Sequence, residues 1–197
     1  VKGAYTEALH IYRDCAYLHA AEHSATNERP LRLLEIGFGT GLNAAVTAMS
    51  ANAQYPVHYI TLEKYPVDPS LVEELGYDRL VDAQLFSAIH AASWEQPTAI
   101  TPHFTLEKRC CDLLTTPLPG DIDIVYFDAF APEKQPEMWS TDIFARIYQA
   151  MSSHSVLTTY CAKGVIRRLL QSTGFSIERL AGPVGGKREI LRATKRI

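Results

Sequence analysis

Short apolar runs alternate with amphipathic segments along most of the chain. Each apolar run is bounded by glycine, proline or polar residues, which is typical of buried strands, whereas apolar residues that recur every three or four positions indicate helices. This pattern predicts strands at residues 31–36, 57–62, 104–110, 122–127, 155–160, 175–180 and 189–193, and helices at residues 42–50, 69–75, 80–92, 137–151 and 165–172.

The order of these elements predicts an α/β fold. Strands that alternate with helices form a parallel sheet with helices on both faces. Only the loop GPVGGKR separates the last two predicted strands, which indicates an antiparallel pair and favours a methyltransferase-type sheet over a plain dinucleotide-binding one. We therefore predict a class I, Rossmann-like fold with a mostly parallel seven-stranded sheet and an antiparallel last strand. Residues 1–197 form one domain in this interpretation, with 1–30 as a lead-in segment.

The stretch LEIGFGTGLN, residues 34–43, has glycines at alternating positions between a predicted strand and a predicted helix. Gly37 allows a sharp turn, and Gly39 and Gly41 leave room for a ligand to approach backbone N–H groups at the start of the helix. A pyrophosphate-binding loop spaces its glycines G-x-G-x-x-G, whereas this loop reads G-x-G-x-G and follows Glu35. We interpret the spacing as typical of an S-adenosylmethionine site.

Three acidic residues follow later strands of the predicted sheet. Glu63 ends the second strand, 22 residues after Gly41, where a carboxylate can accept hydrogen bonds from ribose hydroxyls. Asp112 follows the third strand and is placed to accept a hydrogen bond from an adenine amino group. Asp128 follows the fourth strand, at the sheet edge where ligands bind in open α/β folds. Asp128 would bind the methionine ammonium group or orient an incoming amine.

The residues after Asp128 read AFAP and include an aromatic ring and a proline. Phe130 and Pro132 fit the walls of a pocket for a flat base, and equally fit plain packing. Trp139, a little further along, fits the core better than a substrate platform.

Composition narrows the function classes. The chain has four cysteines without a CxxC pair and seven scattered histidines, so we expect reduced thiols, a cytoplasmic location and no metal site. It contains neither an apolar run near 18 residues nor a signal peptide, so we expect no membrane association. The chain begins at Val1 rather than Met, and we expect that an N-terminal piece is missing.

Positive charge is concentrated near the C-terminus. The net charge is −3, yet residues 163–197 hold nine of the 19 Lys and Arg residues and two of the 22 Asp and Glu residues. Such a basic segment on an acidic body is typical of a phosphate-binding surface, and equally of an ordinary solvated strand and helix face.

Several motifs together resemble the methyltransferase domain of the MnmC-type tRNA-modifying enzymes. They are LEIGFGTGLN, FDAFAPEKQPEMW, AKGVIRRLLQSTGF and GKREILRA, and they occur in the family's order over nearly the whole chain. The segment from Gly3 to His10 resembles the family's lead-in, with Glu7 at its acidic position.

The resemblance implies S-adenosylmethionine as methyl donor and the amine of 5-aminomethyl-uridine at the wobble position of tRNA as acceptor. Glu35 and the three glycines would meet the amino-acid part of the donor, with Glu7 beside them, Glu63 its ribose and Asp112 its adenine. Asp128, Phe130 and Pro132 would form the transfer site. Phosphate contacts to tRNA would come from five basic residues: Lys163, Arg167, Arg168, Lys187 and Arg188.

The chain departs from the family pattern at both ends. Bifunctional members carry a flavin-dependent oxidase domain after the methyltransferase, whereas this chain ends at Ile197. We therefore expect a stand-alone form without FAD, and an oxidoreductase on a separate chain as the partner that acts earlier in the pathway. Members also carry a longer segment before the lead-in.

Three other functions stay open at this point. A methyltransferase of the same fold that acts on a small-molecule amine fits the acidic body of the chain. A non-catalytic module that retains the S-adenosylmethionine pocket is a further alternative, against which the presence of Glu35, the three glycines and Asp128 argues. A nicotinamide-dependent reductase fits neither the glycine spacing nor the terminal strand pair.

Overall fold

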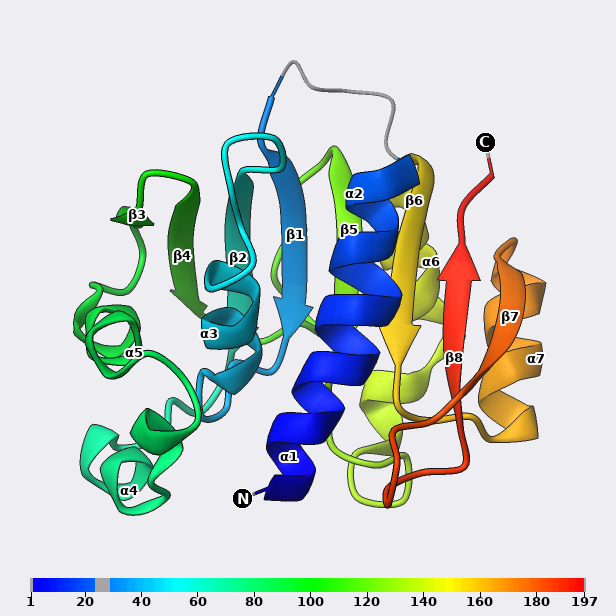
Figure 1. Cartoon of the computed structure of the whole chain (residues 1–197). Helices are drawn as coiled ribbons and strands as arrows, with labels where there is room; N and C mark the ends of the chain where they lie inside the picture. The colour runs from blue at the N-terminus through cyan, green and yellow to red at the C-terminus, as the bar shows by residue number, and fades with distance from the viewer. Residues whose placement is uncertain (1, 24–28, 197) are drawn as a thin grey trace.

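A single eight-stranded sheet forms the centre of the computed structural model, which describes residues 2–23 and 29–196. The strand order is β3-β4-β2-β1-β5-β6-β8-β7 (Figure 1). The strands are β1 (Leu31–Ile36), β2 (Val57–Glu63), β3 (Pro97–Thr101), β4 (Phe104–Cys110), β5 (Ile122–Phe127), β6 (Met151–Thr159), β7 (Ser176–Ala181) and β8 (Glu189–Thr194).

The predicted fold class is confirmed. Strands β4, β2, β1, β5 and β6 pair in parallel, and β8 pairs antiparallel with both β6 and β7. The predicted count of seven strands is wrong, because β3 adds an antiparallel edge strand beside β4. Its sequence, PTAIT, begins with proline and buries none of its side chains fully, so the apolar pattern does not reveal it.

Helices cover both faces of the sheet. The helices after the first strand are α3 (Leu42–Ala48), α4 (Pro69–Glu74), η2 (Tyr77–Arg79), α5 (Ala83–Ala91), η3 (Pro136–Trp139), α6 (Thr141–Ala150) and α7 (Gly164–Thr173). One face packs against α3 and α5, and the other packs against α6 and α7 (Figure 1). Among the helices of residues 2–23 and 29–196, none combines the length and apolarity needed to cross a membrane.

The lead-in segment forms a helix for which the sequence pattern gave no prediction. It runs through α1 (Lys2–Glu7), η1 (Ala8–Leu18) and α2 (His19–His23), and residues 1 and 24–28 of the predicted lead-in lie outside the described part. The η1 part has π-type geometry and packs on α3, β5 and β6. It is also joined to the C-terminal hairpin, since Arg192 Nη1 donates to Cys15 O at 3.2 Å. The N-terminal helix and the C-terminal hairpin are therefore in direct contact.

Two predicted helices begin later than their apolar pattern suggests. The predicted helix at 80–92 is α5, which starts at Ala83 with the Asp82 side chain accepting from Leu85 N at 2.8 Å. The predicted helix at 137–151 is α6, which starts at Thr141 with Ser140 as its cap. A short 3₁₀ turn precedes each of them. Capping side chains satisfy N–H groups of the first helical turn, so these caps fix the starts.

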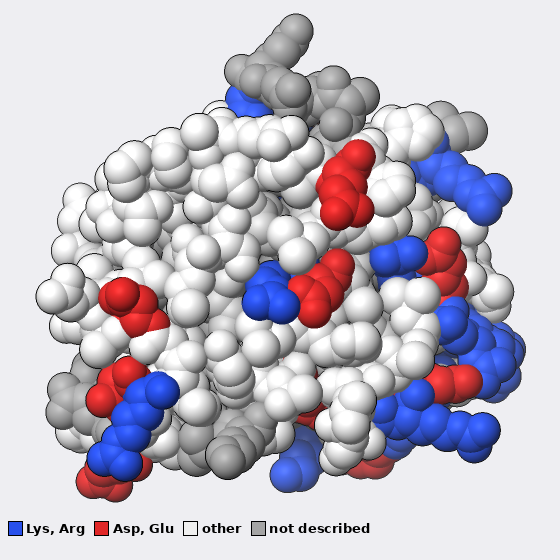
Figure 2. Space-filling view, in the orientation of Figure 1, with Lys and Arg blue, Asp and Glu red and all other residues white. Residues whose placement is uncertain are grey.

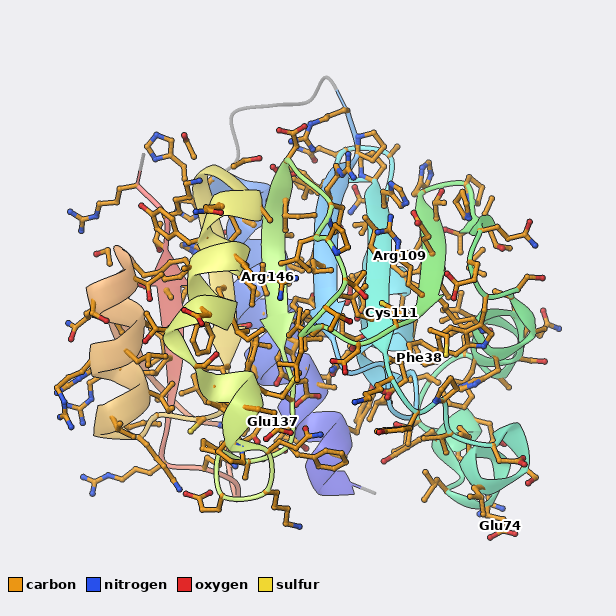
Figure 3. The ribbon with its side chains drawn as sticks, turned by 180° about the vertical axis from the view of Figure 1, so that it is seen from behind. Phe38, Glu74, Arg109, Cys111, Glu137 and Arg146 are labelled. Carbon is orange, nitrogen blue, oxygen red and sulfur yellow. The ribbon has the colours of Figure 1, made fainter. Side chains whose placement is uncertain are left out.

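An arginine of α6 holds the connection between β4 and β5. Arg146 donates to Leu113 O at 2.8 Å and to Leu114 O at 3.1 Å, and also bonds Thr116 O. Seen from behind, Arg146 lies on the α6 side of the sheet, and Cys111 lies near the carboxyl end of β4 (Figure 3). This contact keeps the loop after β4 close to the edge where the other parallel strands end.

Removing the Asp82 cap should loosen α5. We expect Asp82→Ala to lower the free energy of unfolding by about 1 kcal/mol, because one N–H group of the first turn loses its partner. Urea unfolding followed by circular dichroism measures this change, with Asp78→Ala, in the preceding 3₁₀ turn, as the matched control. Equal midpoints for the two variants would contradict the capping role.

Candidate active site

The glycine loop joins β1 to α3 at the carboxyl edge of the sheet. Gly37 has φ +92°, and a Cβ there would lie 3.2 Å from Asp128 O. Gly41 has φ +72°, and a Cβ there would lie 2.9 Å from Phe38 Cζ. Both backbone conformations favour glycine, so the loop can pass this close to its neighbours only with these residues. The backbone of the glycine loop therefore packs directly against the residue that follows β5.

A cavity of about 460 Å³ lies beside this loop, which is within the usual size range of small-ligand sites. Most of the residues predicted for the donor and transfer sites line it. They are Glu7, Gly37, Gly39, Glu63, Asp112, Asp128 and Phe130. Gly41, Glu35 and Pro132 are not part of its wall. The sheet edge thus brings together residues from four strand ends and the N-terminal helix.

Two acids stand at the end of the cavity nearest β2 and β4. Glu63 accepts hydrogen bonds from Gly39 N at 3.1 Å and from Tyr65 N at 2.9 Å. Asp112 forms an ion pair with Lys64 at 2.8 Å and accepts from Leu114 N, and these contacts lower its pKa. This end therefore offers carboxylate oxygens that are already oriented and can accept from ligand hydroxyl or amino groups.

Asp128 stands at the other end, held by two side chains that the sequence did not single out. Tyr12 Oη donates to Asp128 Oδ1 at 2.7 Å, and Asn43 Nδ2 donates to Asp128 Oδ2 at 2.9 Å. Asn43 belongs to the glycine motif itself and could have been noticed there. Tyr12 lies 116 residues from Asp128 in the chain, and no local pattern reveals such a pair.

Glu35 lies behind the cavity rather than in its wall. Its side chain is 0% exposed, because it lies on the face of β1 that α3 covers. Its Oε1 accepts from Asn43 Nδ2 at 3.1 Å, so Glu35 reaches the cavity only through Asn43. Burial raises the pKa of Glu35 to about 8, so this carboxyl is mostly neutral at pH 7. The expected direct contact with a ligand therefore becomes an indirect one.

The pKa of Asp128 is raised to about 6, mainly by burial, while the hydrogen bonds from Tyr12 and Asn43 oppose the rise. A carboxyl with this pKa is mostly ionised at pH 7, yet can take up a proton at little cost. Asp128 is therefore suited to binding a cation or to receiving a proton from one.

Aromatic side chains flank the opening of the cavity. Tyr65 and Phe130 both line it, although their side chains are 70% and 68% exposed. Trp139 is buried and donates from Nε1 to Phe130 O at 2.8 Å, so it fixes the loop backbone, in keeping with its predicted place in the core. An exposed ring beside a cavity of this kind offers an apolar face to a flat group.

A second hollow of about 480 Å³ adjoins the cavity, and Tyr160 lines both. Pro132, Lys163, Lys187 and Arg188 line the second hollow. The remaining two predicted phosphate contacts, Arg167 and Arg168, lie on α7. The structure therefore separates the five basic residues into a group in the hollow and a pair on the helix.

Basic side chains gather on the side of the molecule that carries α7, β7 and β8 (Figure 2). Part of this charge is balanced locally. Arg179 pairs with Glu189, Arg192 pairs with Glu178, and Lys163 pairs with Glu133. The surface is consequently less positive than the sequence count suggests.

Tyr12 should control the protonation of Asp128. We expect the Asp128 carboxyl to titrate near pH 6 and Tyr12→Phe to raise its pKa, because the lost hydrogen bond favours the ionised form. Carbon NMR of labelled aspartate carboxyls measures both values, with Tyr148→Phe on α6 as the control. An unchanged or lower pKa in Tyr12→Phe would show that the tyrosine does not act on this carboxylate.

Comparisons with known proteins agree with this geometry. A family model described as S-adenosyl-L-methionine-dependent methyltransferase matches residues 85–196, more than half of the chain. The tRNA 5-methylaminomethyl-2-thiouridine biosynthesis bifunctional protein MnmC of Pseudomonas fluorescens (strain Pf0-1) is 33% identical over 171 residues, covering 80% of this chain and 26% of that protein. The corresponding protein of Marinomonas sp. (strain MWYL1) is 31% identical over 175 residues, covering 80% and 25%. The chain thus spans about a quarter of the length of these relatives.

Solved structures share the fold. A crystal structure of MnmC2 from Aquifex aeolicus superposes with a TM-score of 0.69 at 22% identity, covering 98% of this chain and 61% of that chain. The spermidine synthase of Thermotoga maritima superposes with a TM-score of 0.62 at 14% identity, covering 100% and 62%. At these identities the likeness is one of fold.

The resemblance to the methyltransferase domain of MnmC-type proteins is confirmed by the family model and the curated relatives. The cavity, with its glycine loop and acids at both ends, is in keeping with that assignment. The chain belongs to the S-adenosyl-L-methionine-dependent methyltransferase family.

Proposed function

We propose that this methyltransferase acts on an amine of tRNA, the 5-aminomethyl group of the wobble uridine, in the last step that forms 5-methylaminomethyl-2-thiouridine. The observation that carries the proposal is the position of Asp128. This carboxylate lies at the end of the donor cavity that adjoins a basic hollow, and Tyr160 forms a wall of both. The names of the curated relatives point to the same modified base.

The donor would lie along the cavity, with its adenosine end near Glu63 and Asp112 and its amino-acid end near Glu7 and Asp128. Glu63 would accept from the ribose hydroxyls and Asp112 from the adenine amino group, since both already line that end of the cavity. The backbone of Gly37 and Gly39 would meet the amino-acid part, with Glu7 beside it. Glu35 and Gly41 would act indirectly by shaping this end. S-adenosylmethionine supplies a methyl group bonded to a positively charged sulfur.

Asp128 would prepare the acceptor. An alkylamine is mostly protonated at pH 7 and must lose a proton before its nitrogen can attack a methyl carbon. A carboxylate with a pKa of about 6 can hold the ammonium form and take its proton. Tyr12 and Asn43 fix both oxygens of this carboxylate, so it is oriented before the acceptor arrives, which is how positioning contributes to rate.

The base and phosphates of the acceptor would lie on the side of the second hollow. Phe130 presents an exposed ring beside the donor cavity, and Pro132 lines the second hollow, which suits a base turned out of its stack. Lys163, Arg167, Arg168, Lys187 and Arg188 would contact phosphates. Binding should then weaken steeply as salt is raised.

Methyl transfer moves no electrons between redox partners, so the proposed step requires neither FAD nor a metal. The aminomethyl acceptor must come from an earlier reaction, which we assign to an oxidoreductase acting before this enzyme. We place both activities in the cytoplasm, where tRNA is modified.

The test is a methylation assay on tRNA that lacks the final wobble methyl group. We expect transfer from S-adenosylmethionine to add the mass of one CH₂ unit to 5-aminomethyl-uridine, detected by mass spectrometry of the digested nucleosides. Asp128→Ala should lower the turnover at least about a hundredfold, the usual contribution of a proton-transfer group. The donor affinity of this variant, measured by calorimetry, should change much less.

Two results would contradict the proposal. Methylation of a small amine such as a polyamine, with tRNA left unmodified, would assign the site to a small-molecule methyltransferase. Donor binding without methylation of either acceptor would assign it to a binding module. Asp78 is exposed and is not part of the cavity wall, so Asp78→Ala serves as the control for general effects of losing an acid.

A further inference from the structure

One of the five basic residues, Lys187, stands apart from the rest. It lies in the loop between β7 and β8, and its Nζ is 3.9 Å from the centroid of the Tyr160 ring. Tyr160 lines both the donor cavity and the second hollow. Its Oη donates to Ala129 O at 2.8 Å, and Ala129 follows Asp128 directly. The Lys187 ammonium therefore sits at the junction of the two hollows, one ring away from the backbone next to Asp128.

The other basic residues occupy different surroundings. Lys163 forms an ion pair with Glu133, and Arg167 and Arg168 lie on α7 outside both hollows. Arg188 lines the second hollow but has no described contact with Tyr160. Within the described part of the chain, Lys187 alone is a basic residue stacked on the wall that the two hollows share.

The backbone that carries Lys187 is held in place. Gly182 N donates to Arg188 O at 3.0 Å, closing the loop across Lys187. A Cβ at Gly182 would lie 1.7 Å from Lys187 O, so only glycine permits this approach. His10 Nε2 lies 2.8 Å from Ala181 O, which joins the base of the loop to the N-terminal helix. The backbone position of Lys187 is thus set by the fold.

A fixed positive charge beside the acceptor amine changes which form of the amine is stable. An ammonium group close to a second ammonium group is disfavoured, and the neutral amine is not. Building on the proposed function, we propose that Lys187 acts on the chemistry of the acceptor, by disfavouring its ammonium form while keeping Asp128 ionised and able to take the proton. In that step one N–H bond of the acceptor breaks and one O–H bond forms on Asp128. The amine keeps the electron pair that then attacks the methyl carbon.

Several titratable groups face this junction. Two of them, Glu7 and Tyr12, approach from the N-terminal helix. The others approach from the strand ends and loops: Asp128, Glu133, Tyr160, Cys161, Lys163, Arg188 and Glu189. Lys187 lowers the pKa of both Asp128 and Cys161, so its charge reaches the cavity end. Glu7 raises the pKa of Asp128 and opposes Lys187.

The test uses Lys187→Met and Lys187→Arg in the full chain. At saturating tRNA and donor, kcat reports ionisations in the bound complex. We expect the acid limb of the kcat profile to move to higher pH by about one unit in Lys187→Met, which is about a tenfold loss of kcat below the limb. The plateau at high pH should stay close to that of the unchanged protein. Lys187→Arg keeps the charge and should keep the limb.

Phosphate binding predicts a different result. If Lys187 only contacts tRNA phosphate, Lys187→Met raises KM and reduces the salt dependence of binding while the acid limb of kcat stays in place. That result would overturn the proposal. Arg79 is exposed and lies in η2, between α4 and α5 in the chain. Arg79→Met is therefore the control for a lost positive charge.

A second measurement needs no acceptor. NMR titration of the Asp128 carboxyl should show a higher pKa in Lys187→Met than in Arg79→Met or the unchanged protein. An unchanged pKa would overturn the inference whatever the acceptor proves to be. Conversely, failure to methylate tRNA together with a raised Asp128 pKa would refute the proposed acceptor and leave the electrostatic role of Lys187 standing.

Discussion

The site depends on how one partly buried carboxylate is satisfied. Asp128 directly follows a central strand beneath the N-terminal helix, where its charge would be costly without donors. Tyr12 and Asn43 supply those donors, and they come from the two helical elements packed on that face of the sheet. The same two hydrogen bonds therefore hold η1 and α3 against the sheet and orient the Asp128 carboxylate. The rest of the cavity, including the glycine loop that passes against Asp128 O, is arranged around this pair of hydrogen bonds.

Much of the fold and part of the site could be predicted, because both arise from local patterns. Four of the parallel strands end at, or are closely followed by, glycine or an acid, so Gly37, Glu63, Asp112 and Asp128 were identified from their distance to a strand end. Strand β3 was not, since a short edge strand that buries none of its side chains fully leaves no apolar pattern. Contacts between segments that are distant in the chain leave no local sequence pattern either. The hydrogen bond of Tyr12 to Asp128 and the cation–π contact of Lys187 with Tyr160 could therefore be found only in the structure. The start of α5, by contrast, could have been predicted, because Asp82 is a common capping residue type. We placed the start at residue 80 because we followed the apolar pattern, and Asp82→Ala tests the cap.

Glu35 shows a limit of reading motifs by type alone. An acid before the glycines suggests a ligand contact, but the side chain of a strand residue points to one face or the other. Glu35 points to the face covered by α3 and is fully buried there. Its raised pKa then makes it a neutral partner of Asn43. The motif predicts a ligand site at this edge of the sheet, and the pleat of β1 determines that its first acid faces away from the cavity.

The order of strands at the edge has a consequence for how the protein matures on the ribosome. β8, the last strand in the described chain, lies between β6 and β7 rather than outside them. A nascent chain that has emerged only as far as β7 therefore cannot complete its sheet, and β7 has no partner until β8 is made. The loop that carries Lys187 is fixed by the same late pairing. Since β8 is synthesised after β1, β2 and β5, the donor pocket can form around those strands while the acceptor side is still open, and the two halves of the site mature in sequence.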